Sequence, residues 1–126
     1  MTGLELEALG RRAVACKGWR WMPGMITVDG VRIYGCGVGV IDGVDNDSEY
    51  LDYPVERLDL PDLQDPATLG CLLALVREAR KSDRIHLQYV HYFAGAGRWE
   101  CLERYNLYSG GATEAEALVA ALESAP

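Results

Sequence analysis

The chain has 126 residues, of which 49% are hydrophobic and 25% charged, a balance that suits one domain with a sizeable core. Its formal net charge of −7 argues against a general nucleic-acid-binding protein, because neutralising phosphates requires a basic surface. No apolar run approaches the ~18 residues of a membrane span, and the first residues lack the basic and apolar runs of a signal peptide. We expect a single cytoplasmic domain over residues 1–126.

The first predicted element is an amphipathic helix. Apolar residues recur at helical spacing from Leu4 to Lys17, and Gly18 is placed to end that helix. After it, the strands Met25–Val28 and Val31–Tyr34 flank Asp29-Gly30, a dipeptide that favours a two-residue hairpin turn.

A two-residue turn sets the register of this hairpin. It pairs Val28 with Val31 and Ile26 with Ile33, and this apolar face is predicted to join the core. The opposite face is then expected to carry Met25, Thr27, Arg32 and Tyr34.

More strand is expected beyond the hairpin. The segments Cys36–Ile41 and Glu49–Leu58 read as strands, and Asp42–Ser48 between them has the composition of an exposed turn. Together with the hairpin they predict a meandering antiparallel sheet.

The second half of the chain alternates helix, hairpin and helix. Asp65 is expected to cap a helix that has Pro66 in its first turn. Two aromatic-rich strands between Ile85 and Tyr108 surround a glycine-rich loop, and Thr113–Glu116 is a capping box that opens the last helix. The fold class is therefore α+β, with an N-terminal helix, about five or six antiparallel strands and two further helices.

Alternation along the second hairpin divides its side chains between two faces. One face is predicted to hold Leu87, Tyr89, Phe93, Trp99, Cys101 and Leu107, and the other Gln88, Tyr92, Arg98, Arg104, Asn106 and Tyr108. The predicted core consists of Leu9, Ile26, Ile33, Leu72, Val76, Leu87, Leu118 and Leu122.

The chain shows no catalytic or metal-binding motif. Its four cysteines are far apart in the sequence and form no zinc or redox pair, so we expect reduced, mostly buried thiols. His86 and His91 project to opposite faces of a strand and cannot jointly hold a metal. The glycines of Gly35–Gly39 have the wrong spacing for a phosphate-binding loop, and a bulged strand explains them. We predict a protein without enzymatic activity and without a cofactor.

Two features point to ligand binding. The run Trp19–Met25 concentrates indoles and thioethers around a cation, and it is open to two interpretations: ordinary core, or the wall of a site for a flat heterocycle. Arginines, tyrosines and an asparagine on the two hairpins could bind phosphates and a base. The candidate ligand-binding residues are Trp21, Met22, Arg32, Tyr34, Thr68, Arg77, Tyr92, Arg98, Arg104 and Asn106.

Four segments carry a family resemblance: Gly18–Met25, Pro61-Asp62, Asp65–Ala79 and Ala112–Leu122. They resemble a recurrent small phage or prophage protein, and the nearest functional assignment is the first-described family of phage anti-Thoeris proteins. That resemblance implies a non-enzymatic, oligomeric protein that sequesters glycocyclic ADP-ribose, with some members also holding cyclic oligonucleotides.

Two other functions stay open. The net charge of −7 and the acidic residues from Asp42 to Glu49 also suit an acidic protein-interaction module that inhibits a host nuclease or another defence protein. A small nucleotide hydrolase would need a Cys and His pair assembled in space.

Overall fold

The computed structural model describes residues 2–37, 40–45, 53–54, 59–91, 95 and 97–126. In chain order the elements are α1 (Gly3–Ala15), β1 (Arg32–Gly37), β2 (Val40–Asp45), β3 (Tyr53–Pro54), α2 (Pro66–Ala79), β4 (His86–Val90), β5 (Arg98–Glu103), β6 (Asn106–Gly111) and α3 (Glu114–Glu123). The α+β class and its three helices are confirmed. None of these helices is long and apolar enough to span a membrane.

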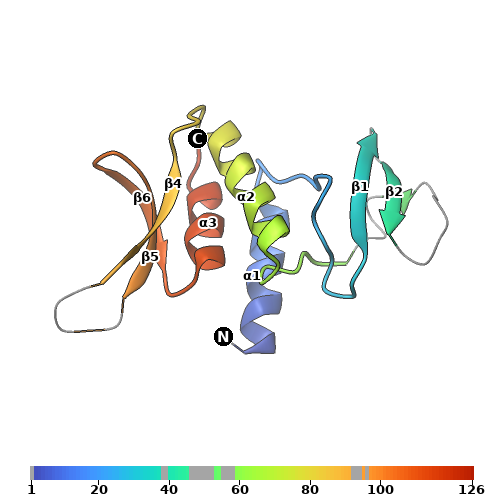
Figure 1. The fold of residues 1–126 in the computed structure, drawn as a ribbon, viewed down its shortest axis with the longest axis horizontal. Coiled ribbons are helices and arrows are strands. Elements are labelled where there is room, and N and C mark those ends of the chain that lie inside the picture. Colours follow the sequence, from blue (N-terminus) through green and yellow to red (C-terminus); the bar gives the residue numbers. More distant parts are fainter. Residues whose placement is uncertain (1, 38–39, 46–52, 55–58, 92–94, 96) are drawn as a thin grey trace.

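The three helices lie between two antiparallel sheets (Figure 1). Helix α3 is central, because it packs against α1, α2 and the strands β5 and β6. The sheet β4-β5-β6 lies on one side of the helices and the sheet β1-β2-β3 on the other. The described strands thus form two three-stranded sheets rather than one continuous meander.

The helix ends follow the capping residues. The Asp65 side chain accepts a hydrogen bond from the Thr68 N–H at the start of α2, and Thr113 accepts one from the Glu116 N–H at the start of α3. Helix α1 begins with a complete capping box between Thr2 and Glu5. These bonds satisfy N–H groups that have no partner inside the helix.

The prediction of one strand over Cys36–Ile41 is only partly right, because Cys36 and Gly37 end β1 and Val40 and Ile41 begin β2. Gly37 pairs with Val40, so the chain reverses direction between them. Asp42–Asp45, predicted to be part of a turn, belongs to β2, because the real turn lies earlier in the chain. Of the strand predicted over Glu49–Leu58, the structure describes residues 53–54, which form β3, and the rest lies outside the described residues.

The register predicted for the first hairpin is also wrong, by one residue. Ile26 pairs with Arg32, and the Ile33 N–H donates to the Met25 carbonyl. Because a one-residue slip exchanges the two faces of a strand, Met25 is fully buried and Val28 is 56% exposed.

The Thr27 side chain supports this slipped register. Its hydroxyl accepts a hydrogen bond from the Val31 N–H at 3.0 Å and donates to the Asp29 carboxylate. Gly30, with a φ of 90°, closes a loop of three residues, so the turn contains one residue more than the sequence suggested.

The second sheet follows the predicted alternation at β4 and β5. Leu87 pairs with Cys101 and Tyr89 with Trp99, so these four side chains share one face as predicted. A register shift between Cys101 and Leu102 then changes the faces of β6. Leu107 is 54% exposed, whereas Tyr108 packs against the core, the opposite of what strict alternation predicted.

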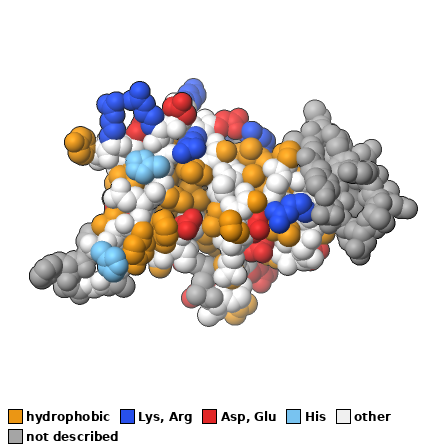
Figure 2. Space-filling view, viewed as in Figure 1, with side chains coloured by type: hydrophobic (Ala, Val, Ile, Leu, Met, Phe, Trp, Pro, Cys, Tyr) orange, Lys and Arg blue, Asp and Glu red, His pale blue; other side chains and the backbone are white. Residues whose placement is uncertain are grey.

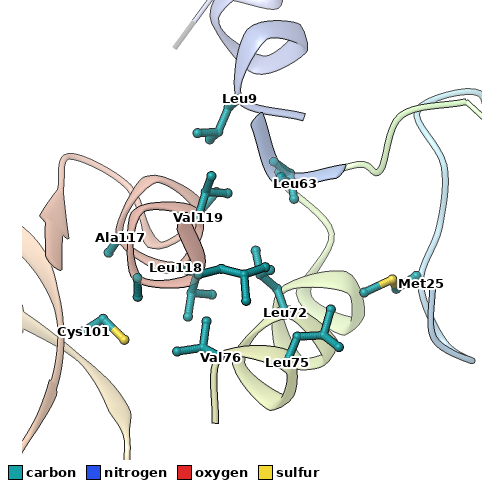
Figure 3. Close-up of a cluster of buried hydrophobic side chains, with 14 of the residues drawn as sticks. Leu9, Met25, Leu63, Leu72, Leu75, Val76, Cys101, Ala117, Leu118 and Val119 are labelled. Carbon is teal, nitrogen blue, oxygen red and sulfur yellow. The ribbon is translucent and has the colours of Figure 1, made fainter. Parts of the chain in front are cut away.

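The core lies between α2, α3, α1 and the segments that flank them (Figure 3). Six of the eight predicted core residues are buried: Leu9, Ile33, Leu72, Val76, Leu118 and Leu122. Leu87 is partly buried against the core. Ile26 is only partly buried, because the register slip places its neighbours Met25 and Thr27 on the buried face instead.

Candidate functional site

Two predicted ligand-binding residues, Arg32 and Thr68, are brought together by Asp65. The Arg32 guanidinium donates to the Asp65 carboxylate at 3.3 Å and to the Gly24 carbonyl at 2.7 Å. The same carboxylate oxygen accepts from the Thr68 N–H and hydroxyl at 2.9 and 3.0 Å. The Thr68 hydroxyl in turn accepts from the Ile26 N–H at 3.0 Å. This network joins the first hairpin to the start of α2.

This hydrogen-bond network stabilises the charged form of Asp65. Partial burial raises the pKa of Asp65, but the hydrogen bonds from Thr68 and Arg32 outweigh that effect and hold the pKa below its ordinary value. Arg32 therefore makes its hydrogen bonds and its ion pair within the fold, and these contacts give it a structural role.

The residues from the aromatic run lie mainly in the core. Trp21 is 7% exposed, and its ring meets Trp19 edge to face with centroids 5.5 Å apart. Met22 packs against the core cluster. These contacts favour the core interpretation of Trp21 and Met22 over that of a ligand wall.

Trp19 also lines a cavity of about 420 Å³ with Lys17 and Arg20, next to the C-terminal ends of α2 and α3. Helix C-termini carry partial negative charge, and Glu78 and Glu123 add carboxylates to the lining. Arg20 is ion-paired with Glu78. The electrostatics of this cavity therefore disfavour an anionic ligand.

The remaining predicted residues lie elsewhere. Arg77 donates to the Ile85 carbonyl at 2.8 Å and so ties α2 to the start of β4. Tyr34 has its backbone in β1, and Tyr92 lies outside the described residues. Arg98 is 3.8 Å from the Glu100 carboxylate, and its guanidinium lies across the backbone of Gly110.

The two hairpins do not form one arginine-bearing face within a single chain. Arg32 begins β1, whereas Arg98, Arg104 and Asn106 belong to the sheet β4-β5-β6 on the other side of the helices (Figure 1). Of the second group, Arg104 and Asn106 lie together at the β5–β6 turn, whereas Arg98 lies at the other end of β5.

This second group extends into a basic surface around the β5–β6 turn. We call it the basic turn surface and define it by Lys81, Arg84, Arg104, Tyr105 and Asn106, all of which are exposed; Asp83, in the same loop as Lys81 and Arg84, is exposed as well. Figure 2 shows Lys and Arg side chains gathered at this end of the molecule. In a chain with a net charge of −7, a local concentration of cations is the feature that attracts an anion.

Hydrogen bonds bring the two loops of the basic turn surface together. Glu103, just before the turn, accepts from the Ser82 hydroxyl at 2.7 Å and from the Tyr108 hydroxyl at 3.1 Å. The Ser82 bond is the main reason that the pKa of Glu103 lies below its ordinary value, and Arg84 and Arg104 add to the effect. Both carboxylate oxygens are occupied by hydroxyl groups.

The cations of this surface have no ion-pair partner among the described residues. The ion pairs of this part of the chain involve other arginines and leave out Lys81, Arg84 and Arg104. Tyr105 is fully exposed, with a relative exposure of 101%. Unpaired guanidinium groups bind phosphate oxygens in a bidentate manner, and an exposed phenol ring stacks on a flat base.

Sequence reasoning identified Arg104 and Asn106 of this surface and missed Lys81, Arg84 and Tyr105. The first two missed residues belong to the α2–β4 connection, which reads in the sequence as an ordinary polar loop. Their proximity to the β5–β6 turn depends on the Ser82–Glu103 hydrogen bond. Tyr105 was missed because the sequence analysis placed it inside a single strand that ends at Tyr108; that prediction is wrong, since the structure divides this stretch into β5 and β6 at a two-residue turn.

The described residues contain no group of three or more His, Cys, Asp or Glu side chains placed to hold a metal ion. Cys16, Cys71 and Cys101 are all free thiols, of which Cys101 alone is fully buried. Burial raises the pKa of each of these thiols.

Comparisons with protein-family models, with curated proteins and with solved structures found no match to this chain.

Proposed function

We propose that this chain is a non-enzymatic binding protein that captures an anionic, nucleotide-type ligand on the basic turn surface and keeps it intact. The observation that carries the proposal is the cluster of unpaired cations beside the fully exposed Tyr105 in an acidic protein. Arg84 and Arg104 bind phosphates in this proposal, Tyr105 stacks on a base and Asn106 offers an amide to its edge.

The resemblance to phage anti-Thoeris proteins refines the ligand class. We propose a cyclic nucleotide immune signal of the glycocyclic ADP-ribose type, held in the cytoplasm of an infected or lysogenic bacterium so that it does not reach its effector. Cyclic oligonucleotides are the second ligand class to test. Sequestration needs affinity without turnover, so the protein has to return the ligand chemically unchanged.

Calorimetric titration with glycocyclic ADP-ribose tests this function. We expect Arg84→Ala and Arg104→Ala each to weaken binding by roughly ten- to hundredfold, the typical consequence of losing a charge-assisted phosphate contact. Arg12→Ala is the matched control, because Arg12 is an exposed arginine on α1 whose partner is Glu123, away from the turn. Unchanged affinity in both turn variants would show that the ligand does not bind here.

Heating the loaded protein and analysing the released nucleotide separates the three functions considered. An intact nucleotide supports sequestration, and an altered one indicates a hydrolase. The acidic protein-interaction module predicts that no nucleotide is retained.

A further inference from the structure

A groove on the opposite side of the molecule from the β5–β6 turn has an apolar floor. It lies between α1 and the connector that precedes α2, and its volume is about 550 Å³. Leu6, Leu60 and Leu63 line it together with Val28, which is 56% exposed. We call this feature the α1 groove. Its exposed apolar surface is the kind that another protein segment covers.

The rim of the α1 groove is acidic. Glu7, Asp59 and Asp62 line it, and the single arginine of the lining, Arg11, is ion-paired with Glu7 at 2.6 Å. Asp59 and Asp62 each accept one backbone N–H through Oδ1, at 2.8 and 3.0 Å, which leaves Oδ2 of each without a partner among the described residues. The groove therefore fits a segment that carries apolar side chains flanked by cations.

The β5–β6 turn of this same chain has that chemistry. Tyr105 projects fully into solvent, Leu107 is 54% exposed, and Arg84 and Arg104 flank them without ion pairs in the described part of the chain. A cavity of this volume has room for a phenol ring and an aliphatic neighbour.

The residue at the first loop position of the turn is not one that a hairpin backbone favours. Arg104, the first of its two loop residues, has a φ of 52°, a conformation that glycine adopts at no steric cost. An arginine in the left-handed region followed by an exposed tyrosine is unfavourable for the isolated hairpin. A role for these side chains outside the chain accounts for both residues.

We propose that the β5–β6 turn of one copy docks into the α1 groove of a second copy, with Tyr105 on the apolar floor and Arg84 and Arg104 facing Asp59 and Asp62. Because turn and groove are different surfaces, the contact is head-to-tail, and repeated contacts form a ring or an open chain. High salt weakens it, since its charged pairs lie at an exposed rim.

Competition between ligand binding and assembly is a consequence that rests on the proposed function, whereas the assembly itself does not. A nucleotide on the basic turn surface and a neighbouring copy would use the same side chains, so they exclude each other. Ligand binding then dissociates the assembly, and assembly weakens ligand binding by the same factor.

Sedimentation velocity at low ionic strength, up to about 100 μM protein, tests the assembly. We expect concentration-dependent oligomers that dissociate at high salt, and Tyr105→Ala should raise the dissociation constant about tenfold or more. Arg104→Gly relieves the positive φ, so it should remain at least as stable as the parent while associating more weakly. A parent protein that stays monomeric, or a Tyr105→Ala variant that associates like the parent, overturns the proposal.

Mixing two variants tests the head-to-tail geometry. Tyr105→Asp removes the docking residue and leaves the groove intact, whereas Val28→Asp places a charge in the groove and leaves the turn intact. Each variant alone should be monomeric, and their equimolar mixture should form a dimer and nothing larger. A mixture that stays monomeric, or one that forms higher oligomers, overturns the geometry.

The Val28→Asp variant also separates this proposal from the proposed function. It should lose self-association but still bind glycocyclic ADP-ribose, because its turn is unchanged. If it associates normally, the docking proposal fails on its own. If it is monomeric but binds no nucleotide, the proposed ligand site fails and the docking stands.

Discussion

The first hairpin, from Met25 to Ile33, and the hairpin of β4 and β5 have similar sequence patterns, yet their registers were decided differently. In β4 and β5, strict alternation put Leu87 and Cys101 on one face. In the first hairpin the second strand kept its predicted core face, with Ile33 buried, whereas on the first strand Met25 was buried in place of Val28. A strand that packs on a helix with a clear apolar face follows alternation, whereas a hairpin tied down by polar contacts follows those contacts.

The sharpest test of this comparison truncates Met25 and Val28 separately and compares the loss of stability. Met25→Ala should lower the free energy of unfolding by about 2–5 kcal/mol, because it leaves a cavity at a fully buried position. Val28→Ala should change it by less than about 0.5 kcal/mol, since the side chain is more than half exposed. Urea denaturation measures both, and the reverse order would restore the register expected from alternation.

The polar contacts of the first hairpin can be broken at Asp65. Asp65→Ala removes the N-cap of α2 and the partner of Arg32, and should cost about 1–3 kcal/mol. Asp65→Asn keeps a good cap but loses the charge, so it should cost less. Equal losses in thermal melts would mean that the cap contributes nothing and that the charge of Asp65 accounts for the whole effect.

The lowered pKa of Asp65 adds a dependence on pH. A carboxylate whose pKa is lower in the folded state than in the unfolded state stabilises the fold above the unfolded-state value of about 3.9. That contribution is lost as the pH falls through the folded-state pKa. Below about pH 4 the parent should therefore lose stability more steeply than Asp65→Asn, and parallel acid profiles would contradict this.

The second sheet is constrained where β6 meets α3. A methyl group at Gly111 would lie 2.6 Å from Glu116 Cβ and 3.2 Å from the Ala117 backbone nitrogen, so Gly111→Ala should cost about 1–3 kcal/mol. For Gly110→Ala, the control one residue earlier, the three nearest atoms all belong to the flexible end of Arg98, which can swing away. Chemical denaturation should show the larger loss at Gly111, and similar losses would mean that α3 can shift.

The smallest expected effect concerns Trp19. Its indole Nε1 is buried and has no hydrogen-bond partner in the described part of the chain, so Trp19→Phe removes an unsatisfied donor as well as some packing. We expect these effects to offset each other, so the free energy of unfolding should stay within about 1 kcal/mol of the parent's. Trp21→Phe, at the more deeply buried indole, is the comparison and should lose more.

The candidate site was only partly predictable. Arginine and asparagine near the end of the second hairpin were recognisable because few cations occur in an acidic chain, and Arg104 and Asn106 do lie on the basic turn surface. Arg32 and Thr68 were chosen as candidate ligand-binding residues for the same chemical reasons, but their partner Asp65 is 33 residues from Arg32 along the chain. The sequence could not show that this carboxylate would occupy them.

The amino-acid sequence by itself determined the local elements of this protein. Caps at Asp65 and Thr113, apolar periodicity in the helices and alternation in β4 and β5 all act within a few residues, and each is confirmed. Tertiary structure decided what depends on partners far away in the chain. The slipped register near Thr27, the bulge before Leu102 and the meeting of Arg84 with the β5–β6 turn each depend on such contacts, because side-chain hydrogen bonds and core packing outweigh local preference there.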